Sequence, residues 1–237
     1  MAPADVSLPS GTVVSCLQRH EVPIVYREVQ SYFSKGLRLS PGDTVFDVGA
    51  NIGLFSLEVY QRCHRDVHLY AFEPVEAIFD VLRANVERCT AGDQLKIFDF
   101  GLSSTSGPVV FAYYPRAPVL STAYPDEDAD IEMAKEATLK NIMHFADAPL
   151  ALRCFRWLPA GLRVPIVHYA IKRTLCSERV ICQMQTLSRV LCDHGVERID
   201  LLKIDAERAE LEIFRGVEPQ DWPKIRQVVV DVHDLDN

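Results

Sequence analysis

Hydrophobic residues near the start of the chain recur at helical spacing. Residues 21–35 place five apolar side chains on one stripe, and Gly36 follows at a position where helices commonly stop. The stripe consists of Val22, Val25, Tyr26, Val29 and Phe33. We therefore predict an amphipathic helix within an N-terminal helical cap over residues 1–40.

Short apolar runs alternate with helical stretches in the next segment. Runs rich in β-branched and aromatic residues predict strands, whereas apolar positions three and four apart predict helices. The predicted strands span 44–50, 67–74 and 94–104, and the predicted helices span 52–63 and 75–89. This alternation is typical of a parallel sheet with helices on its faces.

The alternation is interrupted in the middle of the chain and then resumes. Residues 108–115 have the pattern of an extra strand, and residues 116–180 form an irregular insertion with helical stretches. Further strands are predicted at 180–187, 199–205 and 227–234, and further helices at 186–194 and 206–216. The whole pattern predicts one α/β domain with an insertion.

Polar side chains gather at the carboxyl ends of the predicted strands. They are Asp47, Glu73, Asp205, Asp231 and His233. In parallel sheets, ligands bind outside the carboxyl ends of the strands, at the point where the strand order reverses. Packing alone does not explain four strands ending this way at one edge, so we predict the functional site there.

The first strand ends in the sequence VFDVGANIG, residues 45–53, where Asp47 precedes a turn with Gly49 and Gly53. The spacing differs from the GxGxxG pattern that cradles a dinucleotide pyrophosphate. A carboxylate here would repel a pyrophosphate but would suit S-adenosyl-L-methionine, which carries an ammonium and a sulfonium and no phosphate. Glu73 can accept hydrogen bonds from ribose hydroxyls in either class of ligand. A nicotinamide dinucleotide and a turn that merely closes a corner remain the alternatives.

Composition narrows the classes of function. A chain of 237 residues, 48% of them hydrophobic, can bury one sizeable core. Its net charge of −8 argues against a nucleic-acid partner, which needs cations to neutralise phosphates. The sequence shows no signal-peptide pattern and no bilayer-spanning run, and its seven cysteines lack zinc spacing. We therefore expect reduced thiols and a cytoplasmic location.

Several sequence segments together carry a resemblance to a known family. They are VFDVGANIG, AFEP, TLSRVL, IDLLKIDAERAELEIFRG and VVVDVHD, in this order. The chain resembles the FkbM-type methyltransferases, and residues 21–43 resemble the branch associated with polyketide and peptide synthases. The resemblance implies a Rossmann-like class I methyltransferase sheet and S-adenosyl-L-methionine-dependent O-methylation in secondary metabolism. The acceptor would be a hydroxyl of a small-molecule or carrier-bound polyketide, peptide or sugar.

The resemblance also implies roles for segments and residues. It assigns cofactor binding to Asp47, Gly49, Asn51, Gly53 and Glu73, and places Asp205 near the methyl end of the cofactor. Within one domain over 1–237, the cofactor-binding half spans 41–115, the insertion or lid spans 116–180, and the second half of the sheet spans 181–237.

The chain departs from the family pattern at three places. Arg208 stands where the family usually has Gly, and Asp231 stands where it commonly has Glu. The sequence ends at Asn237, after the fifth predicted core strand, whereas the fold normally adds two more strands. We therefore expect an exposed edge strand. The alternative function is a catalytically incomplete domain that binds the cofactor or a synthase partner.

Methylation of a hydroxyl requires a base to remove its proton. His233 is the first catalytic candidate because it ends the last strand and titrates near neutrality, although it can equally bond a loop carbonyl. Asp205 is the second, and it can orient the acceptor or the cofactor ammonium. A metal site of Asp205, Asp231 and His233 is conceivable, but the spacing does not demand it, and we predict no metal.

Lys203 lies within an otherwise apolar predicted strand, where an unpaired ammonium would be costly. Alternation along the strand places Lys203 and Asp205 on the same side of the sheet. We expect Lys203 to pair with Asp231 on the neighbouring strand, or with Glu207.

The insertion is unevenly charged. Residues 126–136 are mostly acidic, whereas residues 149–177 contain five cations and no acid. A basic, apolar surface on an acidic protein suggests an anionic partner, and we favour an acyl-carrier protein. The alternatives are helices that cover the pocket and, third, a membrane surface. His144 and His168 are expected to be structural.

Overall fold

A computed structural model describes residues 3–89, 94–142 and 159–232. Its centre is a parallel sheet in the strand order β10-β9-β3-β4-β5. The strands are β3 (Asp43–Val48), β4 (Val67–Phe72), β5 (Leu95–Phe98), β9 (Leu201–Ile204) and β10 (Val228–Val230). The order reverses between β3 and β9, which is where a ligand is expected to bind. The α/β prediction is confirmed.

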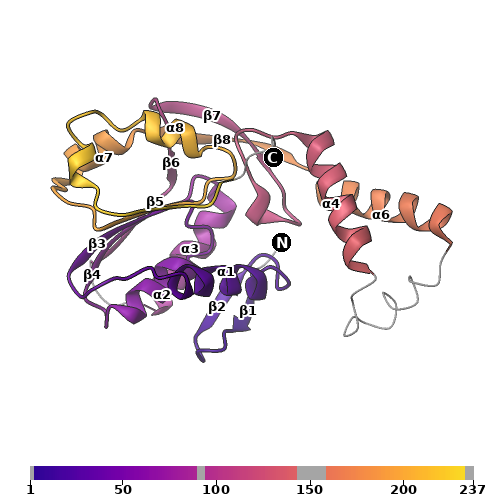
Figure 1. The fold of residues 1–237 in the computed structure, drawn as a ribbon, viewed down its shortest axis with the longest axis horizontal. Coiled ribbons are helices and arrows are strands. Elements are labelled where there is room, and N and C mark those ends of the chain that lie inside the picture. Colours follow the sequence, from indigo (N-terminus) through magenta and orange to yellow (C-terminus); the bar gives the residue numbers. More distant parts are fainter. Residues whose placement is uncertain (1–2, 90–93, 143–158, 233–237) are drawn as a thin grey trace.

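Helices cover both faces of this sheet (Figure 1). On one face lie α1 (Val22–Ser34), α2 (Leu54–Arg62) and α3 (Glu76–Cys89), and on the other lie α7 (Leu187–His194) and α8 (Glu210–Arg215). Successive side chains along a strand therefore point to opposite faces of the sheet. Val45 belongs to the hydrophobic cluster of the first face, whereas Phe46 and Val48 belong to the cluster of the second.

A second sheet lies beside the first and has the strand order β6-β8-β7. It consists of β6 (Phe100–Leu102), β7 (Gly107–Tyr113) and β8 (Glu178–Gln185). The single strand predicted over 94–104 is therefore two strands in two sheets. β5 pairs with β4, whereas β6 pairs with β8, and a bend at Asp99 separates the two strands. The rings of Phe98 and Phe100, on either side of the bend, contact each other.

The N-terminal segment contains a hairpin that the sequence analysis did not expect. Strands β1 (Ala4–Ser7) and β2 (Val13–Cys16) pair antiparallel ahead of α1. A buried side chain of α3 holds the hairpin, because Asn85 accepts from the Ser15 N–H at 2.6 Å and donates to the Ser15 carbonyl at 2.9 Å. This partner lies 70 residues away, so the predicted helical cap needs correction: one helix and one hairpin form it.

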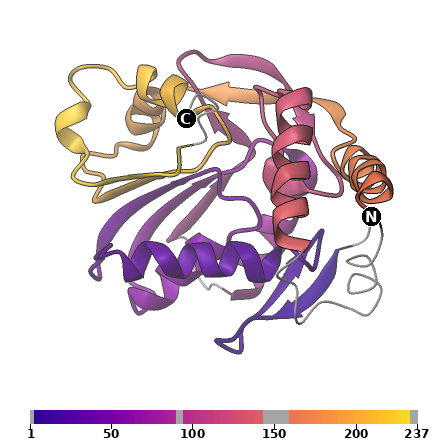
Figure 2. The same ribbon diagram turned by 45° about the vertical axis from the view of Figure 1, so that its right-hand side comes forward.

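The described part of the insertion is mostly helical. It contains the short 3₁₀ helix η1 (Pro118–Leu120) and the helices α4 (Glu127–Ile142) and α6 (Ala160–Thr174). The helices α4 and α6 pack against each other at one end of the molecule (Figure 2). A second 3₁₀ helix, η2 (Trp222–Lys224), precedes β10. The largest shortenings relative to the prediction are at α8, which begins only at Glu210, and at β10, which ends at Val230.

Candidate functional site

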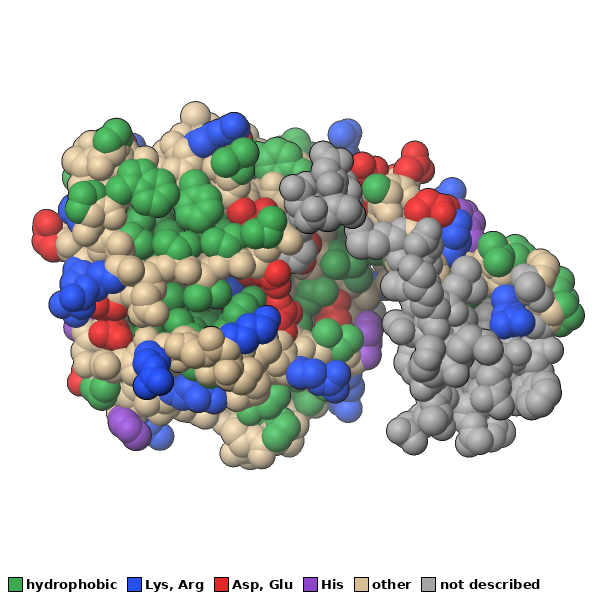
Figure 3. All heavy atoms as spheres, viewed as in Figure 1, with side chains coloured by type: hydrophobic (Ala, Val, Ile, Leu, Met, Phe, Trp, Pro, Cys, Tyr) green, Lys and Arg blue, Asp and Glu red, His purple; other side chains and the backbone are tan. Residues whose placement is uncertain are grey.

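A cavity of about 260 Å³ opens at the carboxyl edge of the sheet, where the strand order reverses between β3 and β9. Its wall comes from α1, the turn after β3, the end of β4, η1 and the loop after β9. In the space-filling view, acidic side chains gather beside a hollow near the middle of the molecule (Figure 3). The polar lining residues are Glu28, Tyr32, Asn51, Glu73, Ser121, Lys203, Asp205 and Glu207.

The glycine turn forms one corner of the cavity. Gly49, Asn51 and Gly53 all have left-handed backbone, with φ of 74°, 51° and 89°. Gly49 is also required by space, because a Cβ on it would lie 1.8 Å from the carbonyl oxygen of Asp205. The turn is therefore pressed directly against the loop after β9, and two of the predicted cofactor residues, Gly49 and Asn51, line the cavity.

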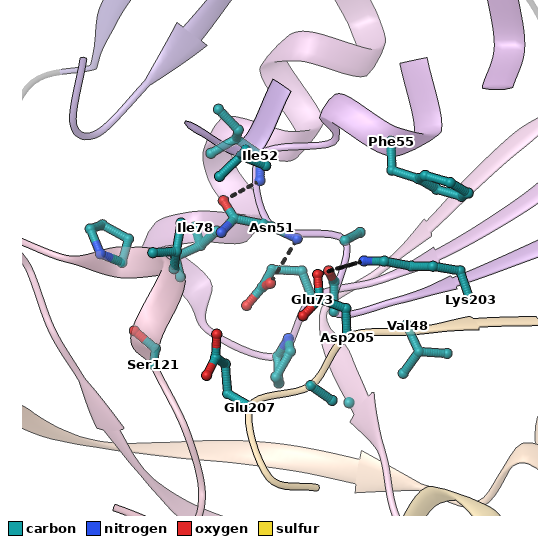
Figure 4. A pocket seen from close by; sticks show the side chains of 18 of the residues that line it. Val48, Asn51, Ile52, Phe55, Glu73, Ile78, Ser121, Lys203, Asp205 and Glu207 are labelled. Atoms are coloured by element: carbon teal, nitrogen blue, oxygen red, sulfur yellow. Dashed lines mark hydrogen bonds and ion pairs between the residues drawn. The ribbon is translucent and has the colours of Figure 1, made fainter. Parts of the chain in front are cut away.

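Glu73 is held between the glycine turn and the start of α3. Its carboxylate accepts the backbone N–H of Asn51 at 3.1 Å (Figure 4) and that of Val75 at 3.0 Å. Burial raises the pKa of Glu73 to about 7, although the two N–H bonds and the charge of Lys203 act in the opposite direction. The carboxyl group thus lines the cavity in a fixed orientation, as the predicted ligand of a ribose would.

Asp47 does not face the cavity. Its side chain is fully buried, accepts the Ser56 hydroxyl at 2.7 Å, and lies 3.1 Å from the Lys203 ammonium. An ion pair of this kind cancels most of the field that the carboxylate would exert on a ligand. The expectation that the charge of Asp47 selects the ligand directly is therefore wrong: in this arrangement the residue holds Lys203 in place.

Lys203 is buried and paired, as expected, but its predicted partners are wrong. Its ammonium lies 3.3 Å from Asp205 (Figure 4) and 3.1 Å from Asp47. It also donates to the Gly49 carbonyl at 3.1 Å. Burial alone would lower the pKa of Lys203, but the two carboxylates outweigh it and raise the pKa. Lys203 therefore remains charged and joins the two strand ends on either side of the reversal.

The residues predicted for catalysis are placed unequally. Asp205 lines the cavity with a quarter of its side chain exposed. Asp231 lies just after β10, close enough to Glu28 of α1 for the two carboxyl groups to share a hydrogen bond. His233 lies outside the described residues.

Glu28 and Tyr32 are among the cavity residues that the sequence did not predict. The Tyr32 hydroxyl donates to the Glu28 carboxylate at 3.2 Å, one helical turn away. Burial raises the pKa of Glu28 to about 7, and the hydrogen bond with Asp231 and the charge of Asp205 act in the same direction. The only signal in the sequence is their spacing of four residues, which does not say which way that side of the helix points.

The loop after β9 forms the second corner. Glu207 and Arg208 both have left-handed backbone, with φ of 46° and 76°, although neither is glycine. The insertion holds them, because the Arg208 guanidinium forms an ion pair with Asp130 of α4 and donates to the Tyr124 carbonyl at 3.2 Å. The Thr122 hydroxyl also donates to the Glu207 carbonyl. The insertion thus shapes one wall of the cavity.

Residues 3–89, 94–142 and 159–232 contain neither a cluster of metal-ligating side chains nor a helix that could span a membrane. No group of three or more histidine, cysteine or acidic side chains is arranged to hold a metal ion. No helix in these ranges combines the length and the apolar character needed to cross a bilayer.

Comparison with known proteins identifies the family. The model of the methyltransferase FkbM domain matches residues 47–236. The chain belongs to the FkbM methyltransferase family. A 31-O-demethyl-FK506 methyltransferase FkbM from Streptomyces tacrolimicus is 34% identical over 232 residues, covering 97% of this chain and 81% of the relative. The methyltransferase sdnD from Sordaria araneosa is 31% identical, over 91% of this chain and 76% of the relative. The predicted resemblance is confirmed, and the chain is a methyltransferase.

Two other matches differ from the FkbM-family chain in length. It is 34% identical to the AMB antimetabolite synthetase AmbE of Pseudomonas aeruginosa, of which it spans only 10%. A crystal structure of methyltransferase FkbM from Methylobacillus flagellatus KT aligns with 82% of this chain and 35% of that one, at 13% identity and a TM-score of 0.44. The family match begins at Asp47, so α1 lies outside it.

Proposed function

We propose that this methyltransferase uses S-adenosyl-L-methionine to methylate a hydroxyl of a small-molecule or carrier-bound metabolite. The charge balance of the cavity supports the cofactor. Four carboxyl side chains line it, and the one ammonium in the described lining, that of Lys203, already lies between Asp47 and Asp205. The four are Glu28, Glu73, Asp205 and Glu207. Such a wall favours a cationic ligand and disfavours a pyrophosphate.

The residues present fit this cofactor. The left-handed turn at Gly49 leaves backbone close to the cavity without a side chain in between, and Glu73 presents a fixed carboxyl group that can accept bonds from two ribose hydroxyls. Asp205 would face the methionine end. The bound cofactor would supply an electrophilic methyl group, and the chain would hold it, exclude water and align the acceptor.

A hydroxyl acceptor is supported by one relative, whose name describes an O-demethyl compound as its substrate. The proton of such a hydroxyl must leave during transfer. Asp205 and His233 remain the proposed groups for this step. Asp205 lines the cavity, where its carboxyl group can reach an acceptor.

A carrier-bound acceptor is supported by the match within a synthetase and by the insertion. In its described part, α6 exposes apolar side chains, among them Leu162, Ile166 and Tyr169, together with the cations Lys172 and Arg173. We propose that this surface meets an acyl-carrier protein, whose acidic character would complement it.

Calorimetric titration tests the cofactor assignment. We expect the protein to bind S-adenosyl-L-homocysteine with micromolar affinity and to show no heat with NADH at the same concentrations. Preference for NADH would refute the assignment. Incubation with isotope-labelled S-adenosyl-L-methionine and a panel of alcohols, amines and carboxylates then tests the acceptor class, and we expect label in base-stable ethers rather than in esters or amines.

A further inference from the structure

Glu28 brings a carboxyl group to the cavity from outside the matched family segment. The residue lies on α1, which ends before Asp47, and its side chain is half-buried against the cavity. The titratable groups that act on Glu28 are Tyr32 of α1, Asp205 after β9 and Asp231 after β10. Lys203 lines the same cavity and is paired with Asp205.

This grouping is unfavourable when the cavity contains only water. The charge of Asp205 and the hydrogen bond with Asp231 act in the same direction as burial and raise the pKa of Glu28. A cation between Glu28 and Asp205 would offset this repulsion. The cavity supplies the space for one, because Glu28 and Asp205 both line it.

We propose that Glu28, together with Asp205, binds the ammonium group at the methionine end of the methyl donor. The proposal rests on the proposed function, since it assigns a residue to the same cofactor. Helix α1 then contributes to donor recognition directly and does more than cover the sheet. Glu28 is thereby a specificity-determining residue that favours donors with an ammonium group over neutral nucleosides.

The proposal has a defined dependence on pH. In the free protein the pKa of Glu28 is raised to about 7, so the carboxyl group is mostly protonated below that value. A bound cation lowers this pKa, and binding therefore expels a proton in the window below about 7. Affinity should rise as the pH increases toward 7 and level off above it. Glu73, whose pKa is also raised to about 7, contributes separately through the ribose.

Calorimetry with two nucleosides isolates the contribution of Glu28. S-adenosyl-L-homocysteine carries the ammonium, whereas 5′-methylthioadenosine lacks the amino-acid part. We expect Glu28→Gln to weaken S-adenosyl-L-homocysteine binding about tenfold at pH 8 and no more than about threefold at pH 6. Proton release, measured in buffers of different ionisation enthalpy, should fall in the same variant. Binding of 5′-methylthioadenosine should change less than about twofold.

Glu21→Gln provides the matched control. Glu21 is another half-buried glutamate at the start of α1, and burial raises its pKa to about 7 as well, but it does not line this cavity. This variant should bind both nucleosides as the wild type does. The proposal is overturned if Glu28→Gln binds S-adenosyl-L-homocysteine normally at pH 8, or if it weakens both nucleosides equally. A wild-type protein that binds neither S-adenosyl-L-homocysteine nor S-adenosyl-L-methionine would instead refute the proposed function itself.

Discussion

The backbone has left-handed residues at both corners of the cavity, but the residue types at these positions differ. After β3, the left-handed positions are filled by Gly49, Asn51 and Gly53, residue types that adopt this conformation at low cost. After β9, they are filled by Glu207 and Arg208, for which the conformation is unfavourable by about 1–2 kcal/mol each. The first corner is stable through its local sequence.

The second corner depends on contacts with the insertion. Arg208 is anchored by Asp130, and Thr122 binds the carbonyl of Glu207, so distant residues offset the local strain. Lys203 ties the two corners together, because it contacts Asp47 and Gly49 on one side and Asp205 on the other. The comparison shows that a strained cavity wall can persist without glycine when tertiary contacts hold it.

Replacing Lys203, which links the two corners, should have the largest effect on stability. Lys203→Met leaves the carboxylate of Asp47 fully buried without a cation, which should cost about 3–5 kcal/mol in the free energy of unfolding. Urea denaturation measures this loss. The double variant Asp47→Asn/Lys203→Met should recover at least half of it, because no buried charge remains. If Lys203→Met lowered the free energy of unfolding by less than about 1 kcal/mol, the buried ion pair would not link the two corners.

Adding a side chain at Gly49, where the two corners touch, should have the next largest effect on stability. Gly49→Ala adds a Cβ 1.8 Å from the Asp205 carbonyl oxygen and also pays for φ of 74°. We expect destabilisation of about 3 kcal/mol, with loss of S-adenosyl-L-homocysteine binding. Gly42→Ala is the matched control, because its φ is 84° and its Cβ would meet no atom within 4 Å. It should cost only about 1 kcal/mol, and equal losses in the two variants would refute the close packing.

Changing the second corner alone should have the smallest effect. Arg208→Gly loses the ion pair with Asp130 but fits φ of 76°, whereas Arg208→Ala loses the pair and keeps the strain. We expect Arg208→Ala to be less stable than Arg208→Gly by about 1 kcal/mol in urea denaturation. Asp130→Asn removes the pair without altering this backbone and serves as the control. The reverse order of stability would show that the left-handed conformation is not retained.

Much of the fold was predictable from the sequence because its signals are local. The alternation of strands and helices, the glycine turn and the collection of polar groups at one sheet edge depend on residue spacing within short segments. Glu73 was found in this way, since a carboxylate directly after a buried strand is visible in the sequence and indeed lines the cavity. The boundary at 94–104 was wrong because the choice between two sheets depends on which partner strand is available.

The direction in which each polar group points was decided only by the tertiary structure. Lys203 stands in register with Asp47 of β3 on one side and with Val229 of β10 on the other, so it meets Asp47 rather than Asp231. The position of Glu28 follows from the docking of α1, which no local pattern specifies. The sequence by itself determined the sheet and its polar edge, because their signals are local spacings. Strand order and helix docking decided which carboxylates are neutralised inside the protein and which remain facing the cavity.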